Sequence, residues 1–511
     1  MPDPPPNCPC CNNPWSSRAG MDDWFCGVCQ EENNHENFAV QGDPSTNFFQ
    51  YVNRQWQETH PIPEGYPSWN NFLELHVQSQ ERCKEILENI EAKNEGDEGK
   101  LQRLFRAALD EDAVELAGIK PLEPLLQHVE AIVQASPPDR PALLGSFVAK
   151  YGISFFWSMG PSPDALDANH TQCHLSQGGL GLPDRDYYLL DDHKDKHEAY
   201  QQHIATLLAL VDRSEANVTN IWNLEVQIAE AHMTRTENRD PQATHNPMTV
   251  TELTEKCGSF YWALYLQEAT CQDNLGTLNV RNVAALQKVC QLLEVIEAET
   301  LRDYLTWHVV HSCAPYLPKA FVDANFEFYE KTLAGTQALK PRWKRAMEMT
   351  ESAMGEALGK LYCAKYFDEE SKDRALAIVE QVRQALQDRL ETVDWIRSDE
   401  TRQQALEKMS HFRTKIGYPD VWKDYSSLVL EEDDALLTMV LKARAVEHAR
   451  EAKEMNAPTN REKWFMTPQT INAYFHPNLN EIVFPAAILQ PPFFDKTVDD
   501  AVNFGAMGAS E

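Results

Sequence analysis

Residues 473–495 read AYFHPNLNEIVFPAAILQPPFFD, and this stretch predicts a β-hairpin. Residues 472–474 open the first strand, the Pro- and Asn-containing residues 476–480 supply a turn, and 482–484 return as the second strand. The prolines that follow have no N–H to donate, so the strand pairing ends there. A hairpin of this kind is either purely structural or an exposed edge to which an extended peptide adds as a further strand.

The composition describes a globular chain with a strong negative charge. Of 511 residues, 42% are hydrophobic and 24% are charged, and 78 acidic against 46 basic residues give a formal charge of −32. Such a surface repels a phosphate backbone, which argues against nucleic acid as a partner. No apolar run reaches the roughly 18–20 residues of a membrane span, and the first residues, MPDPPPNCPCC, lack the pattern of a signal peptide. The sequence therefore predicts a cytoplasmic protein without a membrane partner.

The N-terminus carries the spacing of a four-thiolate zinc site. Cys8-x2-Cys11 is followed after fourteen residues by Cys26-x2-Cys29, and Cys10 is an alternative to Cys11. A module of about thirty residues is too small to fold on apolar burial alone, so structural zinc would supply its stability. The alternatives are a disordered tail or a redox pair at Cys26 and Cys29. Acidic residues outnumber the one basic residue of 1–40, which favours a protein as the partner of this zinc-ribbon-like module.

Helical periodicity dominates from residue 75 to residue 455. In the segment 398–419, Ser398 is the predicted N-cap, apolar residues recur at helical spacing up to Phe412, and Gly417 followed by Pro419 ends the predicted helix. The segment 342–367 predicts a second, longer helix by the same reasoning. These patterns alone predict a large helical domain, and we interpret the apolar stripes as core rather than as a cofactor pocket.

Seven blocks of the sequence resemble the neprilysin and endothelin-converting-enzyme family of zinc metallopeptidases. The blocks occur in the family's order, the resemblance as a whole spans roughly residues 43–508, and GLGLPDRDYY and the last block are the most specific. In chain order the blocks are NFFQYVNRQWQETHPIPEGYPSWNNF (47–72), QGGLGLPDRDYY (177–188), HSCAPYL (311–317), FYEKTLAGTQALKPRWKR (328–345), EALGKLYCAKYF (356–367), KIGYPDVW (415–422) and NAYFHPNLNEIVFPAAILQPPFFD (472–495).

The resemblance implies a mainly α fold with two lobes. A large helical lobe caps a thermolysin-like catalytic lobe, and the chamber between the two lobes admits peptides. We therefore expect a small zinc ribbon at 1–40, the helical lobe at 43–455, and an incomplete catalytic lobe with a short β-hairpin at 456–511. Residues 43–75 are a further candidate for packing on the catalytic lobe.

The resemblance also assigns a role to the start of the hairpin. Asn472 and Ala473 match the family's Asn-Ala-aromatic motif, in which the Asn side chain and the Ala backbone bind the main chain of a peptide substrate. Asn53 stands where secreted relatives carry a cysteine that forms a disulfide, and this departure resembles intracellular or bacterial-type relatives.

Family members hold a catalytic zinc through His-Glu-x-x-His on a helix, in which the two histidines share one face and the glutamate activates water. Residues 502–508 match the segment that precedes this motif, and the sequence then ends at Glu511. No other segment of the sequence supplies this motif. Residues 197–201 have Gln where the second His should stand, and the residues from His448 onward read His-Ala-Arg-Glu, in which Glu does not follow His directly. We therefore assign no catalytic residue and expect a truncated zinc metalloendopeptidase that is inactive as written. The alternative is a non-catalytic module that binds peptides or proteins.

An incomplete lobe would leave apolar side chains without packing partners. Each such side chain is worth about 1.5–3 kcal/mol when it is buried. We therefore expect residues beyond 455 to be loosely ordered. The side chains in question are Ile482, Val483, Phe484, Ile488, Leu489, Phe493 and Phe494.

Overall fold

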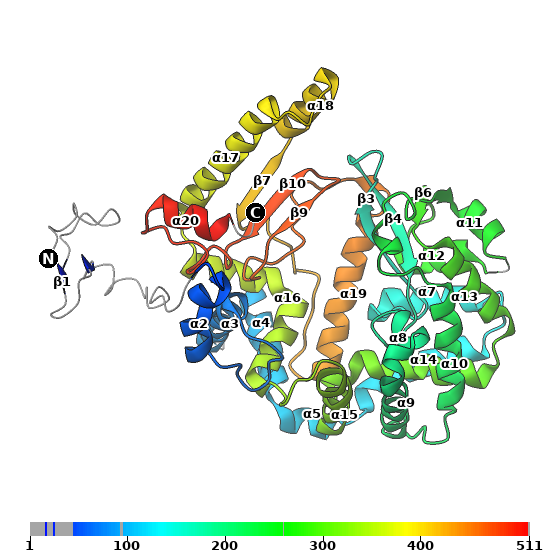
Figure 1. The fold of residues 1–511 in the computed structure, drawn as a ribbon. Coiled ribbons are helices and arrows are strands. Elements are labelled where there is room, and N and C mark those ends of the chain that lie inside the picture. The colour runs from blue at the N-terminus through cyan, green and yellow to red at the C-terminus, as the bar shows by residue number, and fades with distance from the viewer. Residues whose placement is uncertain (1–15, 18–23, 26–43, 92–95, 259, 509–511) are drawn as a thin grey trace.

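The computed structural model describes residues 44–91, 96–258 and 260–508, together with the backbone of 16–17 and 24–25. The described chain is mainly helical, as predicted (Figure 1). Its α-helices are α2 (Phe48–Thr59), α3 (Asn71–Asn89), α4 (Gly96–Leu109), α5 (Glu111–Ala117), α6 (Glu123–Gln134), α7 (Arg140–Tyr151), α8 (Asp186–Leu189), α9 (Lys194–Ala209), α10 (Val218–Ala231), α11 (Val250–Lys256), α12 (Trp262–Thr270), α13 (Val283–Val295), α14 (Ala298–Cys313), α15 (Lys319–Asn325), α16 (Arg342–Tyr366), α17 (Glu369–Thr392), α18 (Asp399–Ser410), α19 (Leu436–Glu454) and α20 (Asp500–Met507).

Short helical turns and small sheets connect these helices. The short 3-10 turns are η2 (Lys120–Leu122), η3 (Asp191–His193), η4 (Glu237–Arg239) and η5 (Ala314–Tyr316), and η6 (Phe326–Leu333) is a π-helix. The strands are β1 (Ser16–Ser17), β2 (Trp24–Phe25), β3 (Trp157–Pro163), β4 (His170–Gln177), β5 (Pro247–Thr249), β6 (Thr277–Val280), β7 (Arg413–Gly417), β8 (Ala457–Pro458), β9 (Tyr474–His476) and β10 (Glu481–Pro485). One sheet has the order β3-β4-β6-β5 with β8 paired to β4, another has the order β7-β10-β9, and β1 pairs with β2.

The first hydrophobic core surrounds α14. Leu301, Leu305 and Val309 of this helix are completely buried, as are residues on its other faces. A helix that is apolar on all sides must be enclosed by other elements. Helices α6, α7, α9, α10, α12 and α13 and the β3-β4-β6-β5 sheet supply the surrounding side chains.

The GLGLPDRDYY block belongs to this core, where its residues satisfy a buried carboxylate. The Tyr188 hydroxyl accepts hydrogen bonds from the Gly181 and Leu182 N–H groups, at 3.1 and 2.9 Å, and donates to Glu225 at 2.8 Å. A Cβ atom at Gly181 would lie 2.0 Å from the Tyr200 hydroxyl, so this position requires glycine. The block is therefore explained by packing and hydrogen bonding.

The second hydrophobic core joins α3, α4 and α16 to the C-terminal part of the chain. Phe484, Ile488, Leu489 and Phe494 belong to it and are at most 3% exposed, and Val483 is completely buried. The expectation that these side chains lack packing partners is therefore wrong. Buried side chains of the helices enclose them within this chain, so the segment after residue 455 is folded onto the helical body.

Helix α19 connects the two cores. Leu437 and Leu441 on one face pack in the first core, whereas Leu436, Met439 and Val440 on the other face pack in the second. Because apolar residues occupy both faces, α19 is stable only between two packed layers. Helices α16 and α19 lie in the middle of the molecule, as Figure 1 shows.

The predicted helix at 398–419 is correct only in its first half. Ser398 is the N-cap, as expected, and its hydroxyl accepts a hydrogen bond from the Thr401 N–H. The helix ends at Ser410, and residues Arg413–Gly417 form β7, which pairs in parallel with β10. The helix predicted at 342–367 is confirmed as α16, with a kink at Met354, whose φ and ψ of −139° and 36° are not helical.

The hypothesis of an N-terminal zinc ribbon falls on Cys8, Cys10, Cys11, Cys26 and Cys29, which lie outside the described residues, so it stays a prediction. The backbone of β1 and β2 pairs antiparallel between the two cysteine pairs. Every cysteine in the described part of the chain is a free thiol. None of the described helices is both long enough and apolar enough to cross a membrane.

Candidate functional site

The predicted hairpin is present as β9 and β10. His476 pairs with Glu481 and Tyr474 pairs with Val483 in an antiparallel register. Asn480 closes the turn with a φ of 51°, a left-handed conformation that asparagine tolerates better than most residues. Strand β9 lies at the edge of the β7-β10-β9 sheet.

Hydrogen bonds on the far side of β10 fix which backbone groups face outward. Across the parallel pair, the Arg413 N–H donates to the Asn480 carbonyl at 2.9 Å, and the Ala486 N–H donates to the Gly417 carbonyl at 2.8 Å. The N–H and C=O groups of one strand residue point to the same side, and neighbouring residues point to opposite sides. The even-numbered residues of β10 therefore face β7, and the odd-numbered residues face β9.

This alternation determines the orientation of β9. Its residues Tyr474 and His476 lie opposite the odd-numbered Val483 and Glu481, so their backbone groups pair with β10. The N–H and C=O of Phe475, between them, consequently point away from the sheet. The outer edge of β9 thus offers one donor and one acceptor to an added strand.

Asn472 and Ala473 lie immediately before this edge. Asn472 is exposed and Ala473 is half-buried. The Asn472 side-chain oxygen accepts a hydrogen bond from the Ala473 N–H at 2.9 Å, which orients the amide group beside the start of β9. Their role in binding a substrate stays a prediction.

Aromatic side chains flank the edge. The Phe465 ring stacks on His476 with centroids 5.1 Å apart, and the Phe465 N–H donates to the Tyr474 hydroxyl at 3.1 Å. The exposed Phe475 ring stacks on Phe412 at 6.0 Å. Burial and the neighbouring Lys415 lower the pKa of His476, so this ring is neutral near pH 7.

A buried ion pair holds the sheet beneath the edge. The Lys415 ammonium on β7 lies 2.9 Å from the Glu481 carboxylate on β10 and also donates to the Lys463 carbonyl at 3.0 Å. Their side chains are 7% and 0% exposed. A one-residue shift between β7 and β10 would separate the two buried charges, so the pair specifies the register.

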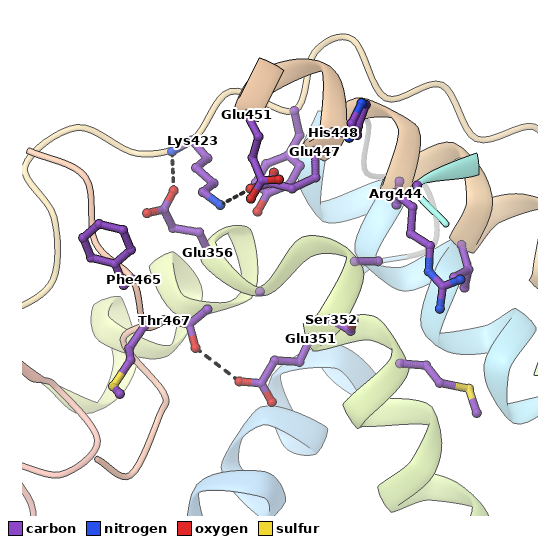
Figure 2. Close-up of a pocket in the computed structure, with 18 of the residues that line it drawn as sticks. Glu351, Ser352, Glu356, Lys423, Arg444, Glu447, His448, Glu451, Phe465 and Thr467 are labelled. Carbon is purple, nitrogen blue, oxygen red and sulfur yellow. Dashed lines mark hydrogen bonds and ion pairs between the residues drawn. The ribbon is translucent and has the colours of Figure 1, made fainter. Parts of the chain in front are cut away.

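A cavity of about 400 Å³ adjoins Phe465. It lies between α16, α19 and the segment 464–467, as Figure 2 shows. Glutamates from both helices line it, together with Lys423, Arg444 and His448. The cavity is therefore walled by helices that belong to both cores.

Hydrogen bonds hold several of the cavity carboxylates. The Lys423 ammonium lies 2.7 Å from Glu447, and the Lys423 backbone N–H donates to Glu356 at 2.5 Å. The Thr467 hydroxyl donates to Glu351 at 3.2 Å. Figure 2 shows these contacts as dashed lines.

The carboxyl groups of the cavity differ in proton affinity. Burial raises the pKa values of Glu351, Glu356 and Glu451. Burial also acts on Glu447, but the hydrogen bond and charge of Lys423 outweigh it and lower the pKa of Glu447. A cationic group that enters the cavity would stabilise the ionised form of the other three carboxyls.

Two sequence profiles described as Peptidase family M13 match the chain, over residues 44–419 and 472–511. The chain belongs to peptidase family M13. Endothelin-converting enzyme 1 of Bos taurus is 29% identical over 489 residues, which are 91% of this chain and 64% of the relative. Neprilysin-11 of Caenorhabditis elegans is 27% identical over 500 residues, which cover 91% of this chain and 59% of the relative. This M13 chain thus spans less than two thirds of the length of these relatives.

Solved structures agree with the M13 assignment. The inhibitor complex of zinc metalloprotease Zmp1 from Mycobacterium tuberculosis superposes with a TM-score of 0.86 and is 34% identical, covering 93% of this chain and 72% of that chain. PepO from Lactobacillus rhamnosis has a TM-score of 0.82 at 23% identity and supports the fold alone. The resemblance inferred from the sequence blocks is therefore confirmed at the level of the family.

A catalytic zinc does not fit the described residues of this M13 chain. They contain no group of three or more His, Cys, Asp or Glu side chains that could hold a metal ion. In the glutamate-lined cavity beside Phe465, which we call the acidic cavity, Glu356 and Glu447 are already bonded to Lys423. His197 is bonded to the Tyr187 carbonyl, and His448 to the Ala269 carbonyl. We therefore derive no catalytic step through zinc from these residues.

Sequence reasoning missed the cavity of this M13 chain. Glu447 and Glu451 are four residues apart and share one face of α19, but acidic pairs on a helix are usually solvated surface. Glu351 and Glu356 lie on either side of the α16 kink at Met354, which helical periodicity does not reveal. The cavity arises only when these helices meet the segment 464–467.

Proposed function

We propose that this chain forms the peptide-binding part of a zinc metalloendopeptidase of family M13. Membership of the family supports the reaction class, and two of the related proteins are named as a zinc metalloprotease and a converting enzyme. The observation that carries the proposal is the outward-facing backbone of Phe475 at the free edge of β9. An extended peptide adds there as a fourth strand.

The groups around the edge define how a peptide lies. The Phe475 N–H and C=O bond one residue of the peptide main chain, and the exposed Asn472 amide bonds a neighbouring peptide group. Phe475 and His476 point to opposite faces of the sheet, so the rings that stack on them, Phe412 and Phe465, lie on opposite faces. Successive side chains of the peptide then point alternately toward the Phe412 face and toward the Phe465 face. The adjoining cavity, with its glutamates of raised pKa, accepts a cationic side chain better than an anionic one.

Binding and cleavage are separable in this chain. Residues 1–511 contain no His-Glu-x-x-His sequence, and the described residues offer no alternative metal site. A polypeptide of residues 1–511 is therefore expected to bind peptides without hydrolysing them. The alternative, a chain whose function is peptide binding itself, predicts the same outcome for residues 1–511.

The test measures binding and cleavage of one peptide by the same protein. A fluorescent, extended peptide with one lysine should bind residues 1–511, as measured by anisotropy, and mass spectrometry should find the peptide intact with and without added zinc. Cleavage that a chelator abolishes would contradict the expected inactivity. Absence of any saturable binding would contradict the assignment of β9.

Matched variants locate the binding edge. Phe475→Pro removes the outward N–H without removing a β9–β10 hydrogen bond, so it should weaken binding by at least about tenfold. Thr414→Pro removes an outward N–H from the opposite edge of the same sheet and should leave binding unchanged. If Phe475→Pro unfolds at a markedly lower temperature than the wild-type protein, a peptide with N-methylated backbone nitrogens tests the same contact on the unmodified protein.

We also propose that the N-terminal cysteines hold one structural zinc and that this module binds a protein partner. The support is the Cys8-x2-Cys11 and Cys26-x2-Cys29 spacing and the acidic character of 1–40. Elemental analysis should find one zinc per chain that is lost when residues 1–40 are deleted. Zinc that remains after this deletion would place the metal elsewhere, and no zinc in either protein would remove the assignment.

A further inference from the structure

A second cavity lies where α5, α15 and the first turn of α16 meet, at the lower rim of the molecule in Figure 1. Its volume is about 380 Å³, within the range of small-molecule sites. Val114, Leu317, Val322 and Leu339 give it apolar walls. It shares no lining residue with the acidic cavity beside β9.

Two arginines of α16 line this cavity. Arg342 and Arg345 have side chains that are only 15% exposed. The Arg342 Nε donates to the Ala108 carbonyl at 2.5 Å, and the Arg345 Nε donates to the Lys340 carbonyl at 3.2 Å. Both Nε bonds fix the guanidinium planes and leave the terminal nitrogens for other partners.

The terminal nitrogens are only partly satisfied. One oxygen of Glu111 lies 3.2 Å from Arg345 Nη2 and 3.7 Å from Arg342 Nη1. Arg342 Nη2 and Arg345 Nη1 are buried and have no hydrogen-bond partner among the described residues. Burial and the charge of Arg345 lower the pKa of Arg342, against the opposing charge of Glu111. The Glu111 carboxylate, whose side chain is 59% exposed, is therefore the shared counter-charge of two largely buried guanidinium groups.

The helix geometry adds to the positive potential at the two arginines. The N-terminus of a helix carries a partial positive charge that acidic residues normally complement. Helix α16 has 25 residues and no acidic residue in its first turn, where Arg342, Lys344 and Arg345 stand instead. Positive side chains at the positive end of a long helix contradict the local preference, and such conflicts are characteristic of functional sites.

The other carboxylates of the cavity are occupied. Glu115 accepts a hydrogen bond from the Lys319 backbone N–H at 2.6 Å, and Asp323 is paired with the Lys319 ammonium. The Lys319 ammonium therefore pairs with Asp323 and its backbone N–H satisfies Glu115, so Glu111 is the carboxylate that pairs with both arginines. The half-buried Glu330 acts on Arg345 through its charge alone. We propose that this cavity binds a carboxylate that carries a short aliphatic group, with the carboxylate on Arg342 and Arg345 and the aliphatic group against the apolar walls.

The ligand chemistry has two sources, free aliphatic acids and the C-terminal residue of a peptide, and the test separates them. Hexanoate and N-acetyl-leucine are titrated into the full chain and compared with hexan-1-ol and N-acetyl-leucinamide, which lack the carboxylate. We expect dissociation constants on the order of 1 mM for an acid of about eight non-hydrogen atoms. Saturable binding of hexanoate alone indicates free acids, and binding of both acids includes peptide C-termini. Equal binding of acids and uncharged analogues, or no binding of either acid, would overturn the proposal.

Substitutions then assign the site. Arg345→Met should weaken binding of the acid at least about tenfold, since a charge-assisted hydrogen bond is lost. Glu111→Gln should instead strengthen it several-fold, because Glu111 competes with the ligand for both arginines. Lys331→Met, on the exposed surface of η6, should change nothing. If Arg345→Met does not fold, the exposed Glu111→Gln still decides, and weaker or unchanged binding in that variant contradicts the site.

Discussion

At the scale of single residues, the Lys415–Glu481 pair shows what sequence reading misses. The two residues are separated by 66 positions and look like ordinary charged residues of a strand. In the structure both are buried, and the pair joins β7, β10 and the Lys463 carbonyl. Its contribution is specificity of register rather than a large gain in stability, because burying two charges is itself costly.

Breaking this pair should be strongly destabilising. Lys415→Met leaves the Glu481 carboxylate buried without a counter-charge, which costs about 3–5 kcal/mol of the free energy of unfolding. Lys331→Met breaks an exposed pair with Glu327 and should cost less than about 1 kcal/mol. Urea denaturation of both variants measures the difference. Similar costs for the two would mean that the Lys415–Glu481 pair is solvated in solution.

His203 should make the stability of the protein pH-dependent. It is buried against Phe328, Trp307 and Tyr329, and burial lowers its pKa to about 4. The unfolded chain takes up this proton near pH 6.5, while the folded chain does so only near pH 4. Stability is therefore lost as the pH falls through this window, by about 1.4 kcal/mol per unit and on the order of 3 kcal/mol in total.

The variant His203→Phe isolates this contribution. Phenylalanine keeps the stacking on Phe328 and does not titrate. Urea unfolding at pH 7, 5.5 and 4.5 should show that the wild-type protein loses more stability on acidification than the variant. The contributions of all other titrating groups cancel when the free energies of unfolding of the two proteins are subtracted. If the two proteins lose stability in parallel as the pH falls, the pKa of His203 is not lowered by folding.

At the scale of elements, two glycines of α16 let the segment before the hairpin cross the helix closely. A Cβ atom at Gly359 would lie 2.6 Å from both the Gln469 side chain and the Pro468 ring, and one at Gly355 would lie 2.8 Å from Thr467. The kink of α16 at Met354 falls in the same turn. The helix therefore positions residues 467–469, and through them the start of β9.

Alanine at Gly359 should destabilise the protein although it favours the helix. Crowding against Pro468 and the buried Gln469 costs about 1–3 kcal/mol, and the helix propensity of alanine recovers at most about 1 kcal/mol. Gly505→Ala in α20 meets nothing within 4 Å and should instead stabilise by about 0.5–1 kcal/mol. The midpoints of thermal unfolding of the two variants should therefore shift in opposite directions. If Gly359→Ala raises the midpoint, residues 467–469 can move aside to make room for the added methyl group.

The error at β7 has a physical cause. Residues 398–417 have one continuous helical pattern, and the local signals at Gly417 and Pro419 fit a helix end. Arg413–Gly417 becomes a strand because β10, far along the chain, offers it a parallel partner. Strand propensity depends on such neighbours, so it cannot be read from a local window.

The pair of helices α17 and α18 should be the first part of residues 44–508 that a protease cuts. The two helices pack on each other and project from the body in Figure 1. The buried residues of α17, Ala375, Ile378 and Val379, all lie in its first half. The connection 393–398 contains Arg397 and an exposed Trp395. Such regions open with little free energy.

Limited trypsin digestion tests this expectation. The first cut within residues 44–508 should follow Arg397, and the two fragments should stay associated because both hydrophobic cores contain residues from before and after this point. Arg397→Gln should delay this cut. Early trimming of the segment after residue 455, with α17 and α18 intact, would contradict the packing of that segment on the helical body.

At the scale of the whole molecule, the sequence predicted the helical fold and the hairpin because both depend on local patterns or on specific family blocks. It did not predict the acidic cavity, most of whose lining residues come from α16, α19 and the segment 464–467. Nor did it predict the cavity lined by Arg342 and Arg345 at the junction of α5, α15 and α16. Those sites are products of packing between distant segments. Asn472 and Ala473 were assigned from the resemblance, and the structure places them beside a free strand edge.

The net charge of the molecule should govern how fast peptides reach this edge. A formal charge of −32 produces a negative potential that attracts cations, and the carboxylates of the adjoining cavity lie in the same field. Salt screens this field with a Debye length of about 10 Å at 0.1 M and about 3 Å at 1 M. The association rate of a lysine-containing peptide should therefore fall at least about tenfold between low and high salt, as measured by stopped-flow fluorescence.

A neutral peptide of the same length should associate at a nearly constant rate, and an acidic one should associate faster as salt is added. Because dissociation depends on contacts at the edge, the dissociation rate should change little, and a salt effect confined to dissociation would show that charge acts within the bound complex rather than on the encounter.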